Sequence, residues 1–225
     1  FDQMTKTVVP ATSAKRIAVP EFVVGVWEGV LQRAALEGDV RLLASGGEEV
    51  KVHGAVLEEA SPVLKAMLQS SMQEGREHLA GGLRREIRLE ESKDTIEAFA
   101  NLLYTGSLPA EFEEEKASNN QILLDVLKLS HRWQLVDLVE LLDARLAVTV
   151  SHLKCSVDAM LTMLEVAVLQ NAVILKQACL DTLRENLEVQ ARFHRGEFQP
   201  VLQNELRKIF GSAGQDDVKK RRRLL

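Results

Sequence analysis

Histidine and cysteine, the side chains that most often hold transition metals, are few in this sequence and widely scattered. None of the histidines falls at the i, i+4 spacing that puts two imidazoles on one helix face. The cysteines lack CxxC spacing and a second pair to complete a zinc site, so we expect two reduced, half-buried thiols. We therefore predict no metal site. The residues concerned are His53, His78, His131, His152, His194, Cys155 and Cys179.

Motifs that build catalytic or cofactor sites are also missing: GxGxxG, GxxxxGKS/T, GxSxG and HExxH do not occur. The pairs Gly46-Gly47 and Gly81-Gly82 lack the lysine and hydroxyl residue of a phosphate loop, and turns explain both. The acidic run from Glu113 to Glu115 lacks the alternating ligands and central glycine of a calcium loop, and we interpret it as a solvated loop. We predict neither enzymatic activity nor a cofactor.

Charge is distributed unevenly along the chain. The formal charge is −5 at pH 7, although a basic cluster lies near the C-terminal end. The rest of the chain is therefore more acidic than the whole. An acidic chain without a basic face is not expected to bind nucleic acid. The cluster is typical of a nuclear-import peptide, although such runs are often only solvated tails. Because a long apolar run and a signal peptide are missing, we expect a nuclear or cytoplasmic protein that does not bind membranes. The cluster consists of Lys219, Lys220, Arg221, Arg222 and Arg223.

The elements that must position any binding surface start after a linker. Residues 1–20 contain Pro10 and Pro20 and show no periodicity, so we interpret them as a linker from an upstream region. The first residue is Phe1, and we expect the sequence to begin inside a longer chain. Hydrophobic residues make up 46% of the sequence but aromatic residues only 4%, which favours packed helices.

Residues 21–150 show a mixed pattern of helices and strands. Apolar residues recur at three- and four-residue steps up to Gly38, which predicts a first helix. Short β-branched segments around Ser45-Gly46-Gly47 predict a hairpin, and Ser61-Pro62 and Ser92 are strong helix starts. The predicted helices span 22–36, 62–70 and 93–104, and the predicted strands 40–44, 49–52 and 86–89.

The second half of the chain is predicted to be helical. Residues 109–120 are expected to form a loop, and four apolar stripes cover 122–133, 135–148, 157–169 and 172–187. We place a domain boundary near residue 150, with an all-helical extension over 151–200 and a C-terminal tail over 201–225.

Val50-Lys-Val-His53-Gly-Ala-Val-Leu57, followed by Ala60-Ser61-Pro62-Val63-Leu64-Lys-Ala-Met67-Leu68, resembles the signature of BTB/POZ domains. Gly38-Asp39-Val40, Ile87, Leu89 and Leu103-Tyr104-Thr105-Gly106 match in the same order. The resemblance implies an α+β fold, with a small sheet flanked by helices over 21–150 and a BACK-like all-helical extension after it.

Within the family the chain looks most like speckle-type POZ proteins and MATH-BTB adaptors, over roughly residues 19–200. Val19-Pro20-Glu21, Ser107-Leu108-Pro109, Ser156-Val157-Asp158 and the stretch from Leu175 to Leu180 carry this likeness. The sequence also departs from the pattern. Val50 and Leu64 replace usual phenylalanines, Gly54 replaces a usual lysine or arginine, and the connection from Glu77 to Arg85 looks longer than normal.

The resemblance implies a substrate adaptor of a cullin-3 ubiquitin ligase. Adaptors of this kind bind cullin-3 through a hydrophobic residue, any residue and a glutamate after the Ser-Pro helix, where this chain has Met72-Gln73-Glu74. A flexible methionine suits an apolar groove and a carboxylate can orient the contact. The alternative is that Met72 packs back onto its own helix while Glu74 faces water.

The resemblance also implies a homodimer, with the helical extension able to extend the cullin contact or to add a second self-association surface. Phe22, Val26, Trp27 and Val30 form the stripe expected at the dimer interface, and packing within one chain is the alternative. The substrate protein is expected to bind a domain outside this chain. A BTB scaffold of architectural or transcriptional type that binds no cullin is the alternative function.

Overall fold

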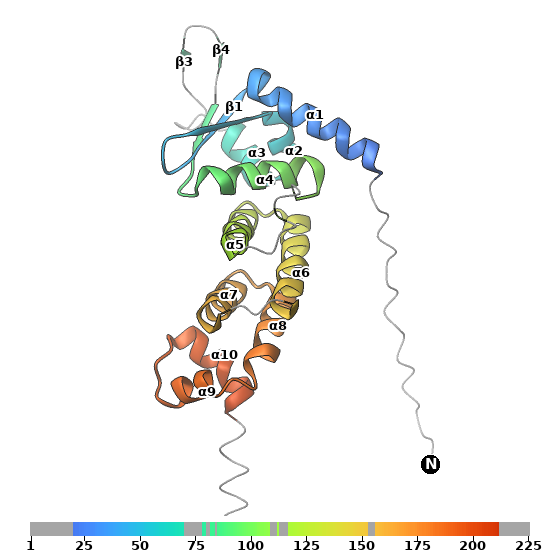
Figure 1. Ribbon diagram of the computed structural model, residues 1–225. Helices are drawn as coiled ribbons and strands as arrows, with labels where there is room; N and C mark the ends of the chain where they lie inside the picture. The colour runs from blue at the N-terminus through green and yellow to red at the C-terminus, as the bar shows by residue number, and fades with distance from the viewer. Residues whose placement is uncertain are drawn as a thin grey trace, which may run out of the picture.

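The computed structural model describes residues 20–69, 78–79, 82–83, 85–108, 112, 117–152 and 156–211. Their elements form two parts stacked end to end (Figure 1): a small sheet with its helices, and a column of paired helices. None of the described helices is both long enough and apolar enough to cross a membrane.

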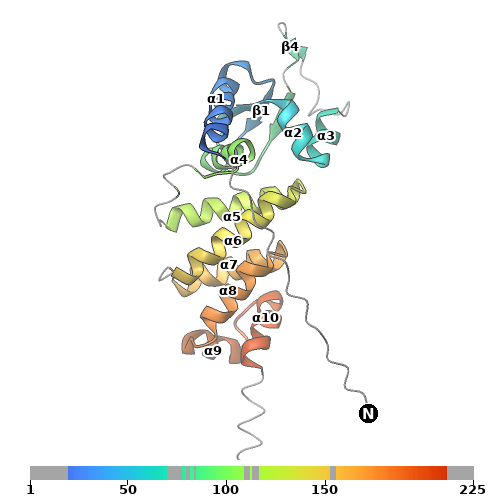
Figure 2. The same ribbon diagram turned by 90° about the vertical axis from the view of Figure 1, so that its right-hand side faces the viewer.

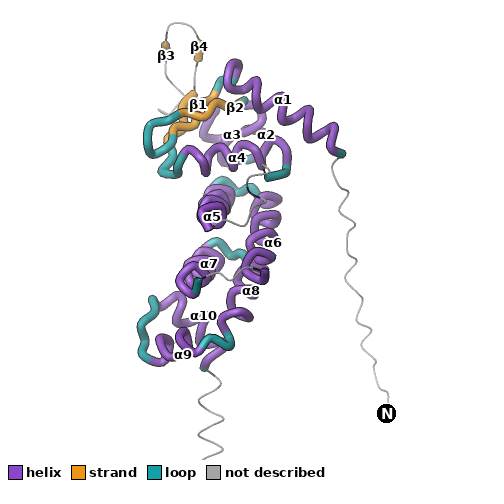
Figure 3. The backbone as a smooth tube through the Cα atoms, viewed as in Figure 1, coloured by secondary structure: helices purple, strands orange, loops and turns teal. Residues whose placement is uncertain are grey.

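The first part is built on a three-stranded mixed sheet with β1 (Val40–Leu43) in the centre. β2 (Glu49–Val52) runs antiparallel to it and β5 (Arg85–Arg88) runs parallel, so that Leu42 lies opposite Val50 and Ile87. Alternate residues of a strand point to opposite faces, and Val40 and Leu42 are accordingly fully buried. A separate small hairpin pairs β3 (His78–Leu79) with β4 (Gly82–Leu83), and Figure 3 shows the two sets of strands apart.

The predicted β1–β2 hairpin is confirmed, and its turn explains the glycines. Gly47 adopts a φ of 88°, in the left-handed region that suits glycine. The Gly47 N–H donates to the Ala44 carbonyl, and the Ala44 N–H donates to the Glu48 carbonyl. The Gly46-Gly47 pair therefore serves a turn.

Four helices accompany the sheet: α1 (Glu21–Glu37), α2 (Gly54–Ala60), α3 (Pro62–Gln69) and α4 (Lys93–Thr105). The predicted starts of α3 and α4 are confirmed. The Ser92 hydroxyl accepts from the Thr95 N–H, and Gly106 closes α4 in the left-handed conformation. α1 packs against α4 and β2.

The second part stacks antiparallel helices, as the turned view in Figure 2 shows. These are α5 (Ala117–Arg132), α6 (Val136–His152), α7 (Val157–Leu169), α8 (Val173–Leu183), α9 (Leu187–His194) and α10 (Pro200–Phe210). The α5–α6 and α7–α8 pairs turn in the same way. Gln134 and Asn171 take positive φ values of 57° and 55°, and the N–H of the residue after each donates back to Ser130 and Ala167, respectively.

The structure differs from the predicted pattern at three helix ends. α5 begins at Ala117, inside the range predicted as a loop. The predicted helix 172–187 ends early, at Leu183 of α8, and Asn186 then caps a further helix, α9, by accepting the Val189 N–H with its side-chain oxygen. We expected a tail from residue 201, whereas 200–210 form α10, whose Leu202, Leu206 and Phe210 share one buried face.

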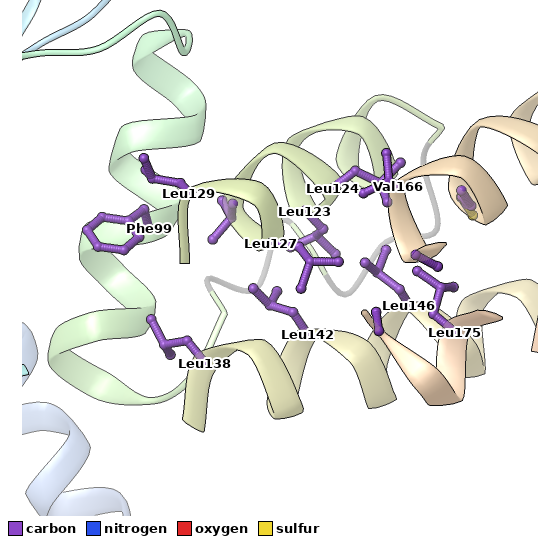
Figure 4. Close-up of a cluster of buried hydrophobic side chains, with 14 of the residues drawn as sticks. Phe99, Leu123, Leu124, Leu127, Leu129, Leu138, Leu142, Leu146, Val166 and Leu175 are labelled. Atoms are coloured by element: carbon purple, nitrogen blue, oxygen red, sulfur yellow. The ribbon is translucent and has the colours of Figure 1, made fainter. Parts of the chain in front are cut away.

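One hydrophobic core runs through both parts. Figure 4 shows Leu127 of α5 pointing toward Leu142 and Leu146 of α6, with Leu175 of α8 beyond them. Asp143 is 7% exposed, and its carboxylate accepts from the backbone N–H groups of Ile174 and Leu175 at 3.1 and 2.7 Å. α8 thus takes its N-terminal cap from α6.

A buried serine joins the two parts, which leads to a test of stability. The Ser61 hydroxyl is fully buried, donates to the Trp133 carbonyl at 2.6 Å and accepts from the Leu64 N–H at 3.1 Å. Ser61→Ala leaves both backbone groups without this partner, so we expect a loss of about 1–3 kcal/mol of unfolding free energy. Urea unfolding measures the loss, with exposed Ser45→Ala as the control. Equal midpoints for the two variants would contradict this role.

Candidate functional site

The outer face of α1 is the most prominent apolar surface near the sheet. Phe22 and Val26 are 74% and 60% exposed and lie one helical turn apart. A side chain added at Gly25 or Gly29 would meet nothing within 4 Å, so the backbone between the apolar residues is open to close approach. Large exposed apolar side chains beside an open backbone mark a surface that suits another macromolecule.

The inner face of α1 fixes the helix on the domain. Ala34 is fully buried, and Val30 and Leu31 pack against the core. Trp27 is 41% exposed and also contacts the Tyr104 ring edge-on, with centroids 6.4 Å apart. Of the residues predicted at the dimer interface, the structure places Phe22 and Val26 outward, Trp27 at the border and Val30 inward.

Tyr104 connects Trp27 of α1 to His53, the residue that follows β2. Its hydroxyl accepts the backbone N–H of His53 at 2.8 Å and lies 3.0 Å from Nδ1 of the same histidine. Burial raises the pKa of Tyr104 above its usual value, and the His53 bond opposes the rise. The histidine of the signature stretch thus orients the tyrosine against which α1 packs.

A charged network next to His53 was not predicted from the sequence. Arg85 Nη2 lies 2.5 Å from Asp39 Oδ2, and Nη1 of the same guanidinium lies 2.6 Å from Glu58 Oε1. Asp39 also accepts the Gly54 N–H at 2.7 Å. The network joins β5, α2 and the residue before β1.

The network fills the space beside Gly54. A Cβ on Gly54 would come within 2.3 Å of Arg85 Nη2 and 2.9 Å of Asp39 Oδ2. The Arg85 guanidinium therefore occupies the space beside the helix start that a side chain at 54 would need. Only the pairing of β5 with β1 brings these residues together, so sequence spacing carried no signal for it.

Burial acts to raise the pKa of the Asp39 carboxyl, but the Gly54 N–H bond and the Arg85 guanidinium together hold it below its usual value. Arg85 and the Gln69 amide also lower the pKa of Glu58. Both carboxylates thus favour the charged form that pairs with Arg85. The network is a structural clamp on the start of α2.

The remaining predicted site residues lie partly outside the described residues. Met72 and Glu74, the predicted cullin contact, and Lys219 to Arg223, the predicted import signal, are among those outside. Cys179 is fully buried, and Cys155 is not among the described residues. Within the described ranges no cluster of three or more His, Cys, Asp or Glu side chains could hold a metal ion.

The charged network predicts a pH-dependent loss of stability. Because the folded pKa of Asp39 lies below its unfolded value of about 3.9, its stabilising contribution is complete above that pH and is lost as the pH falls through the folded pKa. Asp39→Asn removes this contribution but keeps an acceptor for Gly54. We expect wild type to be the more stable at pH 7 and the difference to shrink by pH 3, measured by urea unfolding. A difference that does not change with pH, or one matched by the exposed control Asp181→Asn, would contradict the clamp.

Comparison with known proteins gives the family. A family model described as "BTB/POZ domain" matches residues 31–149, more than half of the chain. Solved structures that match include the BTB (Tramtrack and Bric a brac) domain of human gigaxonin, at 19% identity and a TM-score of 0.39, covering 56% of this chain and 92% of that one. The search of curated proteins finds no match. The small mixed sheet with its helices and the helical extension confirm the predicted fold class. The chain therefore belongs to the BTB/POZ domain family.

Proposed function

We propose that this protein is a homodimeric adaptor that brings a substrate protein to a cullin-3 ubiquitin ligase. Its BTB domain is a protein-interaction module, which supports the general role of adaptor. The observation that carries the dimer is the exposed apolar face of α1, formed by Phe22 and Val26 around Gly25 and Gly29. The cullin contact and the ligase role rest on the sequence resemblance.

A second copy of the chain is the occupant that best suits the α1 face. Two identical helices related by a two-fold axis can each place Phe22 and Val26 against the partner, so one surface satisfies both copies. The glycines allow the two backbones to approach closely. Trp27, anchored on Tyr104, would hold each helix in position while its exposed edge extends the contact.

The proposed cullin contact follows α3. Leu64 and Leu68 are buried, which anchors this helix on the core, and the helix ends at Gln69, shortly before Met72 in the chain. Met72 would fill an apolar groove on the cullin and Glu74 would orient the contact.

Several finer predictions remain part of this proposal. They are the likeness to speckle-type POZ adaptors, the BACK-like identity of the extension, the domain limits at residues 20 and 150, nuclear import through Lys219 to Arg223, and a substrate bound by a domain outside this chain. A dimerisation scaffold that binds no cullin is the alternative, and the cullin test below separates the two.

The dimer leads to the first functional prediction. Val26→Asp places a charge on the apolar face without touching Tyr104 or the buried side of α1. We expect size-exclusion chromatography with light scattering to give a dimer for wild type and a monomer of unchanged helix content for the variant. Leu187→Asp, at a residue 78% exposed on α9, is the matched control and should remain dimeric. A monomeric wild type, or a variant that stays dimeric, would overturn the proposed interface.

The proposed cullin contact leads to the second functional prediction. Met72→Asp replaces the proposed apolar anchor with a charge, and we expect at least a tenfold loss of affinity for the cullin-3 N-terminal region, roughly the cost of losing one interface anchor. Isothermal titration calorimetry on the full chain measures the affinity, with Leu36→Asp, at a residue that is 83% exposed, as the control. If wild type does not bind, the scaffold alternative is favoured. If the variant binds as tightly as wild type, Met72 is not the anchor.

A further inference from the structure

The outer face of α1 carries a symmetric spacing of apolar side chains. Phe22 and Leu36 are 74% and 83% exposed, the two most exposed large apolar side chains of this helix. They lie seven residues on either side of Gly29, where an added side chain would meet nothing within 4 Å. Because seven residues make nearly two turns, the three positions fall almost on one line along the helix. This line has an apolar side chain at each end and open backbone in the middle.

The line faces away from the core of its own chain. Ala34, on the opposite side of α1, is fully buried, and Val30 and Leu31 pack against the core. Leu36 does not belong to the described core. In both ribbon views α1 lies at the edge of the sheet-containing part (Figure 1, Figure 2). The exposure of Leu36 is therefore not explained by packing within one chain.

The line is complementary to itself when it is reversed. A second α1 helix that runs antiparallel and crosses at Gly29 brings its Leu36 beside Phe22 of the first helix, and its Phe22 beside Leu36. The two glycines meet at the crossing, where the lack of side chains lets the backbones come close. At the shallow angle of coiled-coil packing, both ends of the line stay in contact. One sequence thus makes the same apolar contact twice about a two-fold axis.

A charged residue beside the line distinguishes the two possible directions. Arg33 is exposed, and its Nε donates to the Gly29 carbonyl at 3.3 Å, so the side chain lies along this face. In an antiparallel pair Arg33 comes opposite Gly25 of the partner subunit, since both lie four residues from Gly29. A side chain added at Gly25 would meet nothing within 4 Å, which leaves room for the arginine. A parallel pair would instead bring two Arg33 guanidinium groups together, and like charges repel.

We infer that the dimer is formed by an antiparallel pair of α1 helices that cross at Gly29, with Phe22 of each subunit against Leu36 of the partner subunit. The inference rests on the homodimer proposed above. It adds the direction of the helices, their register and the role of Leu36. The specificity for a second copy then comes from the equal distance of the two apolar residues from the glycine.

Site-specific cross-linking on the full chain tests the register. We expect an equimolar mixture of the Phe22→Cys and Leu36→Cys proteins, treated with a short bis-maleimide, to give a covalent dimer in which mass spectrometry finds positions 22 and 36 linked. Each variant alone should give far less covalent dimer, because equal positions lie about 21 Å apart along the antiparallel axis. A mixture of Phe22→Cys with Leu187→Cys, at an exposed residue of α9, is the matched control and should not be linked.

Substitutions at the crossing give a second readout. Gly29→Ala and Gly29→Leu add bulk where the single chain has open space, and both new residues favour helix more than glycine does. We expect unchanged helix content but a dimer dissociation constant raised by at least roughly tenfold for leucine and by less for alanine, measured by analytical ultracentrifugation. Ala35→Leu, at an exposed residue about 100° around the helix from Leu36, should dissociate as wild type does. Leu36→Asp should be monomeric, so it also shows that loss of the dimer alone leaves the cullin affinity of each chain unchanged.

The outcomes separate this pairing from the dimer itself. A monomeric wild type would overturn both. A dimeric wild type in which position 22 is linked to position 22, or 36 to 36, would overturn the antiparallel pairing alone and indicate parallel helices. Equal dissociation constants for Gly29→Leu and Ala35→Leu would show that the helices do not cross at Gly29.

Discussion

The contact between Phe99 and Trp133 holds the two parts of this chain together. The rings meet edge to face with centroids 5.1 Å apart, and both side chains are almost fully buried. Phe99 belongs to α4, which packs beside α1, while Trp133 sits in the turn between α5 and α6. Ser61 adds a hydrogen bond to the Trp133 carbonyl, so α3 meets the same point. α1, α3 and the helical column are therefore all attached to one buried contact.

The column continues the same construction. Each helical pair turns through one residue of positive φ, and Asp143 of α6 caps the start of α8, which ties the second pair to the first. The core is continuous from the sheet to Phe210 of α10. Such a frame holds separate binding surfaces at fixed positions, which is what an interaction adaptor requires. The exposed apolar face of α1 lies at the sheet end of this frame.

Local patterns in the sequence predicted the elements whose cause is local. The β1–β2 hairpin follows from a glycine turn, and the starts of α3 and α4 follow from Ser-Pro and from a serine cap. The end of α8 was missed because the apolar pattern continues past Leu183 to the Asn186 cap of α9. α10 was missed because it becomes a core element only through the packing of Leu202, Leu206 and Phe210. The Arg85 network depends on residues that lie far apart in the chain. The family signature was predictive because it reports the order of elements, but it does not report which exposed side chains face a partner.

Hydrogen exchange at increasing urea concentrations tests most directly whether one core unites the chain. Peptides covering β1 and α7 should lose their slow-exchange protection at the same urea concentration, because the Phe99–Trp133 joint couples the two parts into one cooperative unit. If α7 loses protection at clearly lower urea while β1 stays protected, the parts unfold separately. The binding surfaces would then not be held on one frame.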